Sequence, residues 1–277
     1  MWKSLGVGVA VLMFLPACGL FVVQGDGHKV TQSREVPAVF TRVENHTPLD
    51  VVVREADSSS VSLTLDENLQ RYVTARVSGD ALIIEDSENL YYSGEGRVVA
   101  TLPRFLGAKN DGSGAFLVEG VTQANALTFE LDGSGTVRYC GPASSLTASL
   151  GGSGDMTLCT PEAQVLESVS LDLDGSGTLT YDGSAKQLEA SSEGSGGMNL
   201  TGSAQRLVIR ADGSGGVEAR GLTSSTAYLS VSGSGGVTAT VQDSVSVRID
   251  GSGGVDLWGN ASVRDVTLDG SGNFRRH

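Results

Sequence analysis

Apolar and polar residues alternate along most of this chain with a period of two. Counting back by twos from Gly133 gives Leu131, Phe129 and Leu127, and the positions between them are polar. The same phase precedes other glycines, with apolar residues at Leu173, Leu171 and Val169 and at Ile249, Val247 and Val245. Strict alternation is the pattern of a strand with one buried face, because a helix needs apolar residues three and four positions apart. The pattern predicts an all-β protein.

The strands are punctuated by a repeated triplet, Gly-Ser-Gly. Nine copies begin at Gly112, Gly133, Gly152, Gly175, Gly194, Gly213, Gly233, Gly251 and Gly270. A fixed period of about 20 residues is typical of a solenoid, in which each repeat is one coil. The glycines occupy the inward phase of the alternation, so we expect a tight corner there, where a Cβ would crowd the backbone. The triplets predict a parallel β-helix of coils of about 19–21 residues, with stacked corners.

The first third of the chain lacks the triplet but keeps the alternation. We therefore expect one β-helix domain over residues 36–277, with wider coils and an N-terminal cap over 36–105 and Gly-Ser-Gly coils over 106–277. Residues 1–17 are expected to be a signal peptide, and 18–35 a lipidated cysteine with a short tether.

The N-terminus indicates export. Lys3 precedes an apolar stretch over residues 5–15, and Leu15-Pro16-Ala17-Cys18 resembles the lipobox of bacterial lipoproteins. The resemblance implies cleavage before Cys18 and lipid attachment to its sulfur, with several acyl chains as the membrane anchor. Gly19 rather than Asp follows the cysteine, which favours the outer membrane. An uncleaved membrane anchor over residues 4–23 is the alternative.

Two further cysteines fall at equivalent places in adjacent coils. Cys140 lies five residues after Gly135, and Cys159 lies five residues after Gly154. Stacked coils would bring their Cα atoms to about 4.8 Å, within the range of a disulfide. We expect a Cys140–Cys159 disulfide, since an exported protein meets an oxidising environment. A stacked pair of reduced thiols is the alternative.

Composition narrows the classes of function. The formal net charge of −13 disfavours nucleic-acid binding, which needs clustered Lys and Arg. The three histidines, His28, His46 and His277, do not lie at metal-ligand spacings, and no Gly-x-Ser-x-Gly elbow occurs. We therefore predict no catalytic residue and no defined metal site.

One group of carboxylates recurs with the triplet, immediately before its first glycine: Asp111, Asp132, Asp174, Asp212, Asp250 and Asp269. Stacking would place them in an outward column, interrupted by Gly151, Glu193 and Ser232. The column is a weak candidate for Ca²⁺, a hard cation that prefers oxygen ligands, and this is the one cofactor considered. Alternatively, the carboxylates could act as acid and base on a glycan, or each could cap its own turn.

The order of short segments in the first third resembles a known family. Five segments, in this order, carry the similarity: Phe40-Thr-Arg-Val43, Leu49-Asp-Val-Val-Val53, Asp66-Glu-Asn-Leu69, Val73-Thr-Ala-Arg-Val77 and Gly79-Asp-Ala-Leu-Ile-Ile84. They are similar to the opening of the head GIN domain family. The similarity continues with Val98-Val-Ala-Thr-Leu-Pro103 before Asp111-Gly-Ser-Gly114. The resemblance covers residues 36–272. It implies a right-handed β-helix at the cell surface or in the periplasm, and the family's label is auto-transporter adhesin.

These observations favour a non-enzymatic lipoprotein of the cell envelope that binds a surface glycan or protein and is anchored in the membrane by its N-terminal lipid. An envelope protein that assembles end to end is the second hypothesis, and a β-helical carbohydrate-active enzyme is the third. The sequence predicts neither the ligand nor the oligomeric state.

Overall fold

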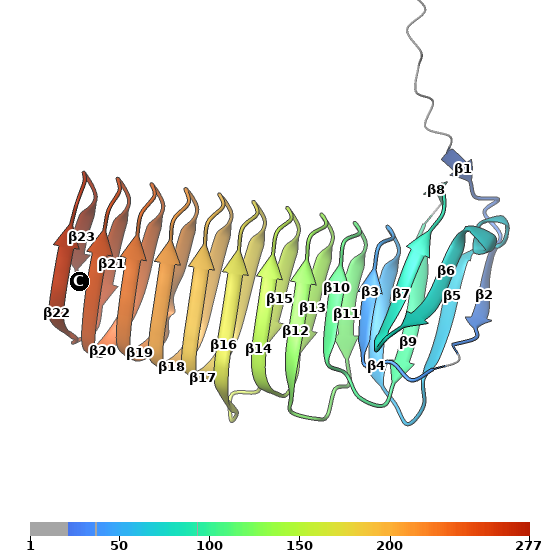
Figure 1. Ribbon diagram of the computed structural model, residues 1–277, viewed down its shortest axis with the longest axis horizontal. Helices are drawn as coiled ribbons and strands as arrows, with labels where there is room; N and C mark the ends of the chain where they lie inside the picture. Colours follow the sequence, from blue (N-terminus) through green and yellow to red (C-terminus); the bar gives the residue numbers. More distant parts are fainter. Residues whose placement is uncertain (1–21, 37, 93) are drawn as a thin grey trace, which may run out of the picture.

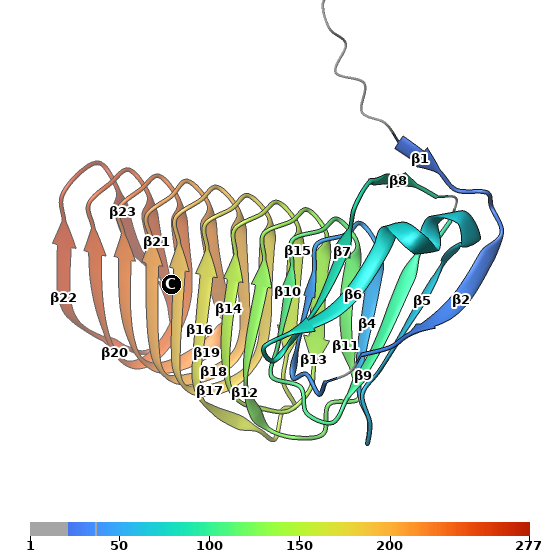
Figure 2. The same ribbon diagram turned by 45° about the vertical axis from the view of Figure 1, so that its right-hand side comes forward.

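The alternating segments form strands that stack into a parallel β-helix (Figure 1). The computed structural model describes residues 22–36, 38–92 and 94–277. Each coil contains one strand that enters a corner and one that leaves it, and the two lie on opposite sides of the core (Figure 2). We call the sheet of entering strands the leading sheet and the sheet of departing strands the trailing sheet. The prediction of a β-helical solenoid is confirmed.

The strands of the two sheets follow the corners along the chain. The leading sheet contains β3 (Arg42–Asn45), β7 (Ala81–Asp86), β10 (Gly107–Asn110), β12 (Asn125–Leu131), β14 (Ala143–Leu150), β16 (Val165–Leu173) and β22 (Ser262–Leu268). The trailing sheet contains β4 (Asp50–Glu55), β9 (Arg97–Leu102), β11 (Ala115–Glu119), β13 (Thr136–Cys140), β15 (Asp155–Cys159), β21 (Gly254–Trp258) and β23 (Asn273–Arg276). Four long strands run from the trailing sheet of one coil into the leading sheet of the next: β17 (Thr178–Ser192), β18 (Gly197–Ala211), β19 (Gly216–Val231) and β20 (Gly236–Ile249).

Parallel pairing brings like residues into files along the rod. Leu171 pairs with Ala190, which pairs with Ile209 in the next coil. All three are buried, and so are the other inward positions of the central coils. Because successive residues of a strand point to opposite faces, the polar residues between them form outward files on the same strands.

Glycine is required at the corners because adjacent coils approach there through their backbones. A Cβ at Gly215 would lie 1.8 Å from the carbonyl oxygen of Gly196, and one at Gly177 would lie 1.9 Å from that of Gly154. Among the triplet glycines only Gly270 has a positive φ, at 138°. Close stacking, rather than an unusual backbone conformation, therefore explains most of the repeat.

The N-terminal cap expected together with wider coils over residues 36–105 is built mainly from antiparallel strands and begins before residue 36. The cap consists of β1 (Val22–Gln24), β2 (Lys29–Arg34), β5 (Ser60–Asp66), the 3₁₀ helix η1 (Glu67–Tyr72), β6 (Val73–Ser78) and β8 (Asn89–Tyr91). β2 pairs with β5, β5 with β9 and β6 with β7, all antiparallel. The segment expected to be a tether over residues 18–35 thus contains two strands of the folded body, β1 and β2.

The coils are also not stacked in chain order. β3 pairs with β7 on one side and with β10 on the other, and β4 pairs likewise with β9 and β11. The β7–β9 coil therefore lies between the cap strands and the β3–β4 coil, although it follows that coil in the sequence. Beyond β10 each coil stacks on the one before it (Figure 1).

The β3–β4 coil turns its corner without glycine, through a buried asparagine. The Asn45 side-chain amide donates hydrogen bonds to the carbonyls of Thr47 (3.1 Å) and Leu49 (3.2 Å). It also donates to Oδ1 of Asn110 in the next coil, at 3.0 Å. Asn110 in turn donates to the Gly114 carbonyl, also at 3.0 Å. Further along the same inward file the asparagines are replaced by Leu131 and Leu150.

The predicted signal peptide and Cys18 lie outside the described residues. Within the ranges that the structure describes, no helix has the length and apolar character needed to cross a bilayer.

Candidate functional site

The six aspartates of the predicted column all lie on the outer face of the leading sheet, one residue before the corners. The backbone amides of the corners do not donate hydrogen bonds to these carboxylates. They donate instead to carbonyls of the preceding coil, as Gly133 N does to Asn110 O (3.2 Å) and Gly215 N to Gly194 O (3.3 Å). No hydrogen bond from a corner amide to these carboxylates occurs in residues 94–277. The interpretation that each aspartate caps its own turn therefore finds no contact to support it.

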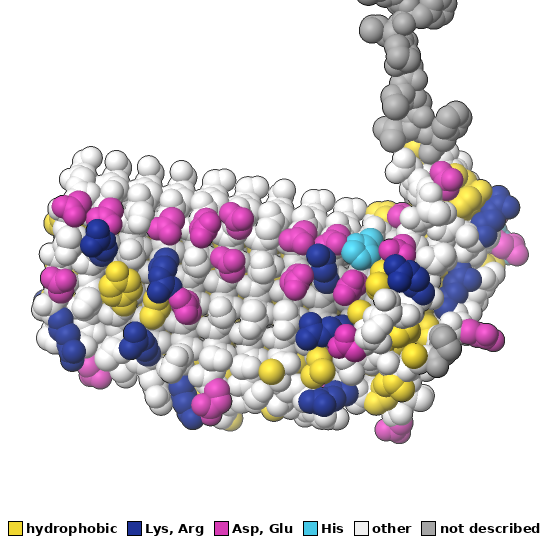
Figure 3. Space-filling model, viewed as in Figure 1, with side chains coloured by type: hydrophobic (Ala, Val, Ile, Leu, Met, Phe, Trp, Pro, Cys, Tyr) yellow, Lys and Arg dark blue, Asp and Glu magenta, His cyan; other side chains and the backbone are white. Residues whose placement is uncertain are grey.

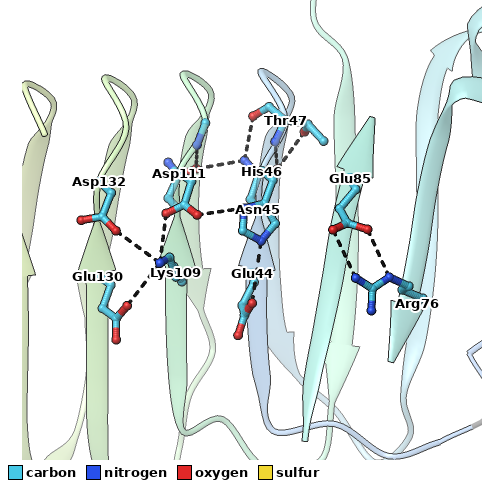
Figure 4. A network of polar contacts seen from close by, with 12 residues as sticks. Glu44, Asn45, His46, Thr47, Arg76, Glu85, Lys109, Asp111, Glu130 and Asp132 are labelled. Atoms are coloured by element: carbon cyan, nitrogen blue, oxygen red, sulfur yellow. Dashed lines mark hydrogen bonds and ion pairs between the residues drawn. The ribbon is translucent and has the colours of Figure 1, made fainter. Parts of the chain in front are cut away.

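A lysine bridges the first two aspartates of the column. Lys109 on β10 lies 3.5 Å from Asp111, 3.2 Å from Asp132 and 3.7 Å from Glu130, measured from Nζ to carboxylate oxygens (Figure 4). Burial lowers the pKa of the Lys109 ammonium, but the hydrogen bond to Asp132 and the three negative charges outweigh it, so the pKa is raised. The cation thus holds three carboxylates from two coils.

A histidine extends this network toward the cap. His46 Nδ1 lies 2.8 Å from Asp111 Oδ2, and Nε2 lies 3.8 Å from Glu44 Oε2 (Figure 4). His46 lies in the corner after β3, and Glu44 lies in β3 itself. The network therefore joins the non-glycine coil to the first Gly-Ser-Gly coils through outward side chains.

The rest of the column has fewer partners. Asp250 is bound by Arg248, with Nε 2.6 Å from Oδ2, whereas Asp174 and Asp212 make no ion pair within the described ranges. No group of three or more His, Cys, Asp or Glu side chains in residues 22–36, 38–92 and 94–277 is arranged to hold a metal ion. Calcium binding along the column remains a prediction for calorimetric titration.

The two cysteines of the repeat region lie opposite each other on the trailing sheet. Cys140 pairs with Cys159 in the strand register of β13 and β15, and their Cα atoms are 4.5 Å apart. The structure joins them in a disulfide. The bond links two neighbouring coils on the outer surface.

Two grooves cross the outer face of the leading sheet, and sequence reasoning missed them. The first, of about 370 Å³, has in its walls Ser168, Ser170, Gln187, Glu189, Arg206 and Arg210. The second, of about 320 Å³, is lined by Arg206, Thr226, Tyr228, Ser244, Ser246 and Arg264. Counting the outward positions three, five and seven residues before each triplet could have identified most of these side chains. The depth of a groove could not be found in this way, because it depends on the sizes of neighbouring side chains.

A third groove, of about 310 Å³, lies on the trailing sheet. Its floor includes Gly197, Gly216 and Gly236, which occupy outward positions of their strands. A Cβ at Gly216 would point to solvent and meet no atom closer than 3.5 Å. At the end of this sheet Trp258 stacks on His277, with ring centroids 4.3 Å apart, and the Arg220 guanidinium lies over the indole at 4.6 Å. Both sheets therefore present hollowed surfaces to solvent.

Comparisons with solved structures agree with this architecture. A "putative adhesin" from Parabacteroides distasonis superposes with a TM-score of 0.70 at 20% identity, over 93% of this chain and 100% of that chain. A "putative lipid binding protein" from the same species gives 0.66 at 18%, over 93% and 100%. A "putative adhesin" from Parabacteroides merdae gives 0.64 at 20%, over 92% and 99%. At these identities the likeness shows a shared fold.

The sequence itself also matches a family. Residues 39–164 and 162–261 match the family described as "Putative auto-transporter adhesin, head GIN domain". No curated protein matches the chain significantly. Because the family match spans most of the β-helix, this chain belongs to the head GIN domain family.

Proposed function

We propose that this protein is a non-enzymatic lipoprotein of the bacterial cell envelope that acts as a surface-binding or adhesive module for a glycan or a protein. Family membership supports an adhesive role at the envelope or surface. The single observation that carries the proposal is the pair of grooves on the leading sheet, whose walls combine hydroxyl, amide and charged side chains over successive coils. Such walls suit polar, repetitive ligands.

The same grooves favour binding over catalysis. Glycoside hydrolysis by the usual routes needs two carboxyl groups on either side of the scissile bond. The two grooves contain one carboxylate, Glu189, and it forms an ion pair with Arg210. This arrangement supports a role in holding a ligand rather than cleaving it.

A glycan array probed with the full chain, purified in detergent, tests the binding function. We expect selective binding to one class of glycan on the array. If the ligand is a protein, beads coated with this chain should instead adhere to cells. Beads coated with albumin are the control. Failure of the protein in both assays would contradict a binding role.

Anchoring through Cys18 is the second part of the proposal, with the outer membrane as the favoured location. The variant Cys18→Ala is expected to lose lipid modification and to leave the membrane fraction, whereas Cys159→Ala should keep both. A Cys18→Ala protein that is processed and fractionates like the wild type would rule out the lipid anchor.

One observation favours the second function, assembly through the end of the rod. β22 pairs only with β20 among the described strands, and its Val266 and Leu268 side chains are 37% and 51% exposed. An open strand edge with apolar residues invites pairing. The opposite end of the rod consists instead of the antiparallel cap strands β2 and β6 and of η1, so the two ends present different edges (Figure 1). Size-exclusion chromatography with light scattering tests this, and a monomer at all concentrations would contradict it.

A further inference from the structure

The two grooves of the leading sheet adjoin each other across the C-terminal coils, and we refer to the pair as the channel. They share Arg206, and the first extends from β16 to β18 while the second extends from β18 to β22. The strand register places Arg206 next to Gln187 on one side and Thr226 on the other. Likewise, Val208 lies between Glu189 and Tyr228. The channel therefore runs along the rod, perpendicular to the strands.

The channel is locally basic although the chain carries a formal net charge of −13. Arg206, Arg210 and Arg264 line it. Arg210 is bound to Glu189, but Arg206 and Arg264 have no ion-pair partner within residues 94–277 or elsewhere in the described chain. On the C-terminal half of this face, basic side chains lie around a small hydrophobic patch, with acidic side chains among them (Figure 3). Guanidinium groups without carboxylate partners are suited to carboxylate or sulfate groups, which they bind through two parallel hydrogen bonds.

Tyr228 and Val208 are the outward apolar side chains in the lining of the channel. Tyr228 is 37% exposed, one of the few large apolar side chains on the coils that reach solvent. An exposed aromatic ring offers a flat surface for the C–H face of a pyranose and a hydroxyl for hydrogen bonding. The hydroxyls of Ser168, Ser170, Ser244 and Ser246 line the same channel. A ring beside hydroxyl groups and arginines suits a sugar better than it suits a bare anion.

The geometry points to a linear acidic polysaccharide as the ligand: we propose that the channel binds a glycan chain that carries carboxylate or sulfate groups. Parallel strands repeat about every 4.8 Å, which is close to the rise of one pyranose unit, so successive sugars would meet successive coils. Arg206 and Arg264 would bind the anionic groups, and Tyr228 would stack on a sugar ring between them. This inference rests on the proposed binding function and names its ligand class.

Isothermal titration of the full chain in detergent tests the inference, with polygalacturonate and dextran sulfate as acidic probes and dextran as the neutral one. We expect binding to at least one acidic probe, weakened by added salt, and none to dextran. The variant Arg206→Gln/Arg264→Gln should weaken binding by about tenfold or more. Tyr228→Ser, which leaves the charge unchanged, should weaken it by roughly threefold or more.

The matched control is Arg138→Gln/Arg275→Gln, which removes the same charge from exposed positions on the trailing sheet. It should keep the wild-type affinity, and all variants should keep the wild-type melting temperature. Equal loss in the control, or equal affinity for polyphosphate, would show attraction by charge alone and overturn the inference. Binding of neutral glycans or a protein, unaffected by Arg206→Gln/Arg264→Gln, would overturn the acidic ligand but leave the binding function standing. Failure with every probe, array glycan and cell surface would overturn both.

Discussion

The N-terminal region and the Gly-Ser-Gly coils solve the same problem, turning a tight corner beside another coil, by different means. In the β3–β4 coil side chains satisfy the amides and carbonyls of Thr47 and Leu49, and Thr47 N and Oγ1 donate to Asn45 Oδ1 at 3.1 and 2.7 Å. In the later coils the corner amides donate to backbone carbonyls of the coil before. The first solution needs particular polar side chains, whereas the second needs the absence of a side chain. Only the second can be repeated indefinitely with one short motif.

The largest effect is expected where a side chain enters a backbone-stacked corner. Gly215→Ala would place its Cβ 1.8 Å from the Gly196 carbonyl oxygen, so the coils must separate locally. We expect a loss of about 3 kcal/mol in the free energy of unfolding, measured by urea denaturation.

Gly236→Ala is the matched control, because its Cβ would point outward and lie 3.8 Å from the Gly254 carbonyl oxygen. It should be neutral or stabilise by a few tenths of a kcal/mol, since alanine restricts the unfolded chain. Equal losses from both substitutions would show that backbone stacking is not why the corners contain glycine.

Next in size is the covalent link, which the repeat region has and the described part of the cap lacks. Cys140→Ala/Cys159→Ala should lower the free energy of unfolding by about 2 to 3 kcal/mol, because the bond restricts the unfolded chain. Reductant should produce the same loss in the wild type and none in the variant. Mass spectrometry of the unreduced protein that finds two alkylatable thiols would contradict the link.

A third test replaces one inward residue in the N-terminal region and one in the Gly-Ser-Gly coils, both from the same file. Asn45→Ala leaves the carbonyls of Thr47 and Leu49 without their donor, and should cost about 2 kcal/mol. Ser192 lies in the same file, within the glycine coils, and its buried hydroxyl has no hydrogen-bond partner. Ser192→Ala should therefore be neutral or slightly stabilising. Thermal unfolding of the two variants separates these outcomes, and a costly Ser192→Ala would remove the proposed contrast.

The smallest effect concerns the network at the junction of the two regions. Lys109→Gln should destabilise by about 0.5 to 1 kcal/mol at neutral pH, because ion pairs near the surface contribute little. The pKa of Lys109 is raised by folding. Its contribution is therefore fully present below the ordinary lysine pKa and is lost only as the pH rises through the higher folded value.

Unfolding followed over pH checks this dependence. The deficit of Lys109→Gln should be constant around neutrality and disappear in strongly alkaline solution. Lys186→Gln, which breaks an exposed pair with Glu167, should have almost no effect at any pH. A deficit that grows toward alkaline pH would contradict the assigned role.

Much of the repeat region could be predicted by counting from the triplets. The count placed Cys140 opposite Cys159 and the six aspartates in one outward file, as the structure has them. Counting could not show that Lys109 reaches Asp132 in the next coil, because side-chain length and direction decide that contact. Nor could it show that Arg206 borders two grooves, since hollows depend on the neighbours of a residue in other coils.

The first third was predicted less well for a physical reason. Its alternation correctly indicates strands such as β4 and β9, but alternation specifies a buried face and not a partner. Without a repeated corner, nothing in the sequence of the N-terminal region indicates that β3 lies between β7 and β10 or that β2 pairs antiparallel with β5.

The sequence by itself determined the strands, the inward and outward faces and the stacking of the glycine coils, because each follows from a local period of two inside a longer period near 20 residues. Only the tertiary structure decided the antiparallel cap, the order of the first coils, the ion pairs of the acidic column and the channel on the leading sheet. These depend on which residues meet across coils, and contacts between distant segments leave no period in the chain.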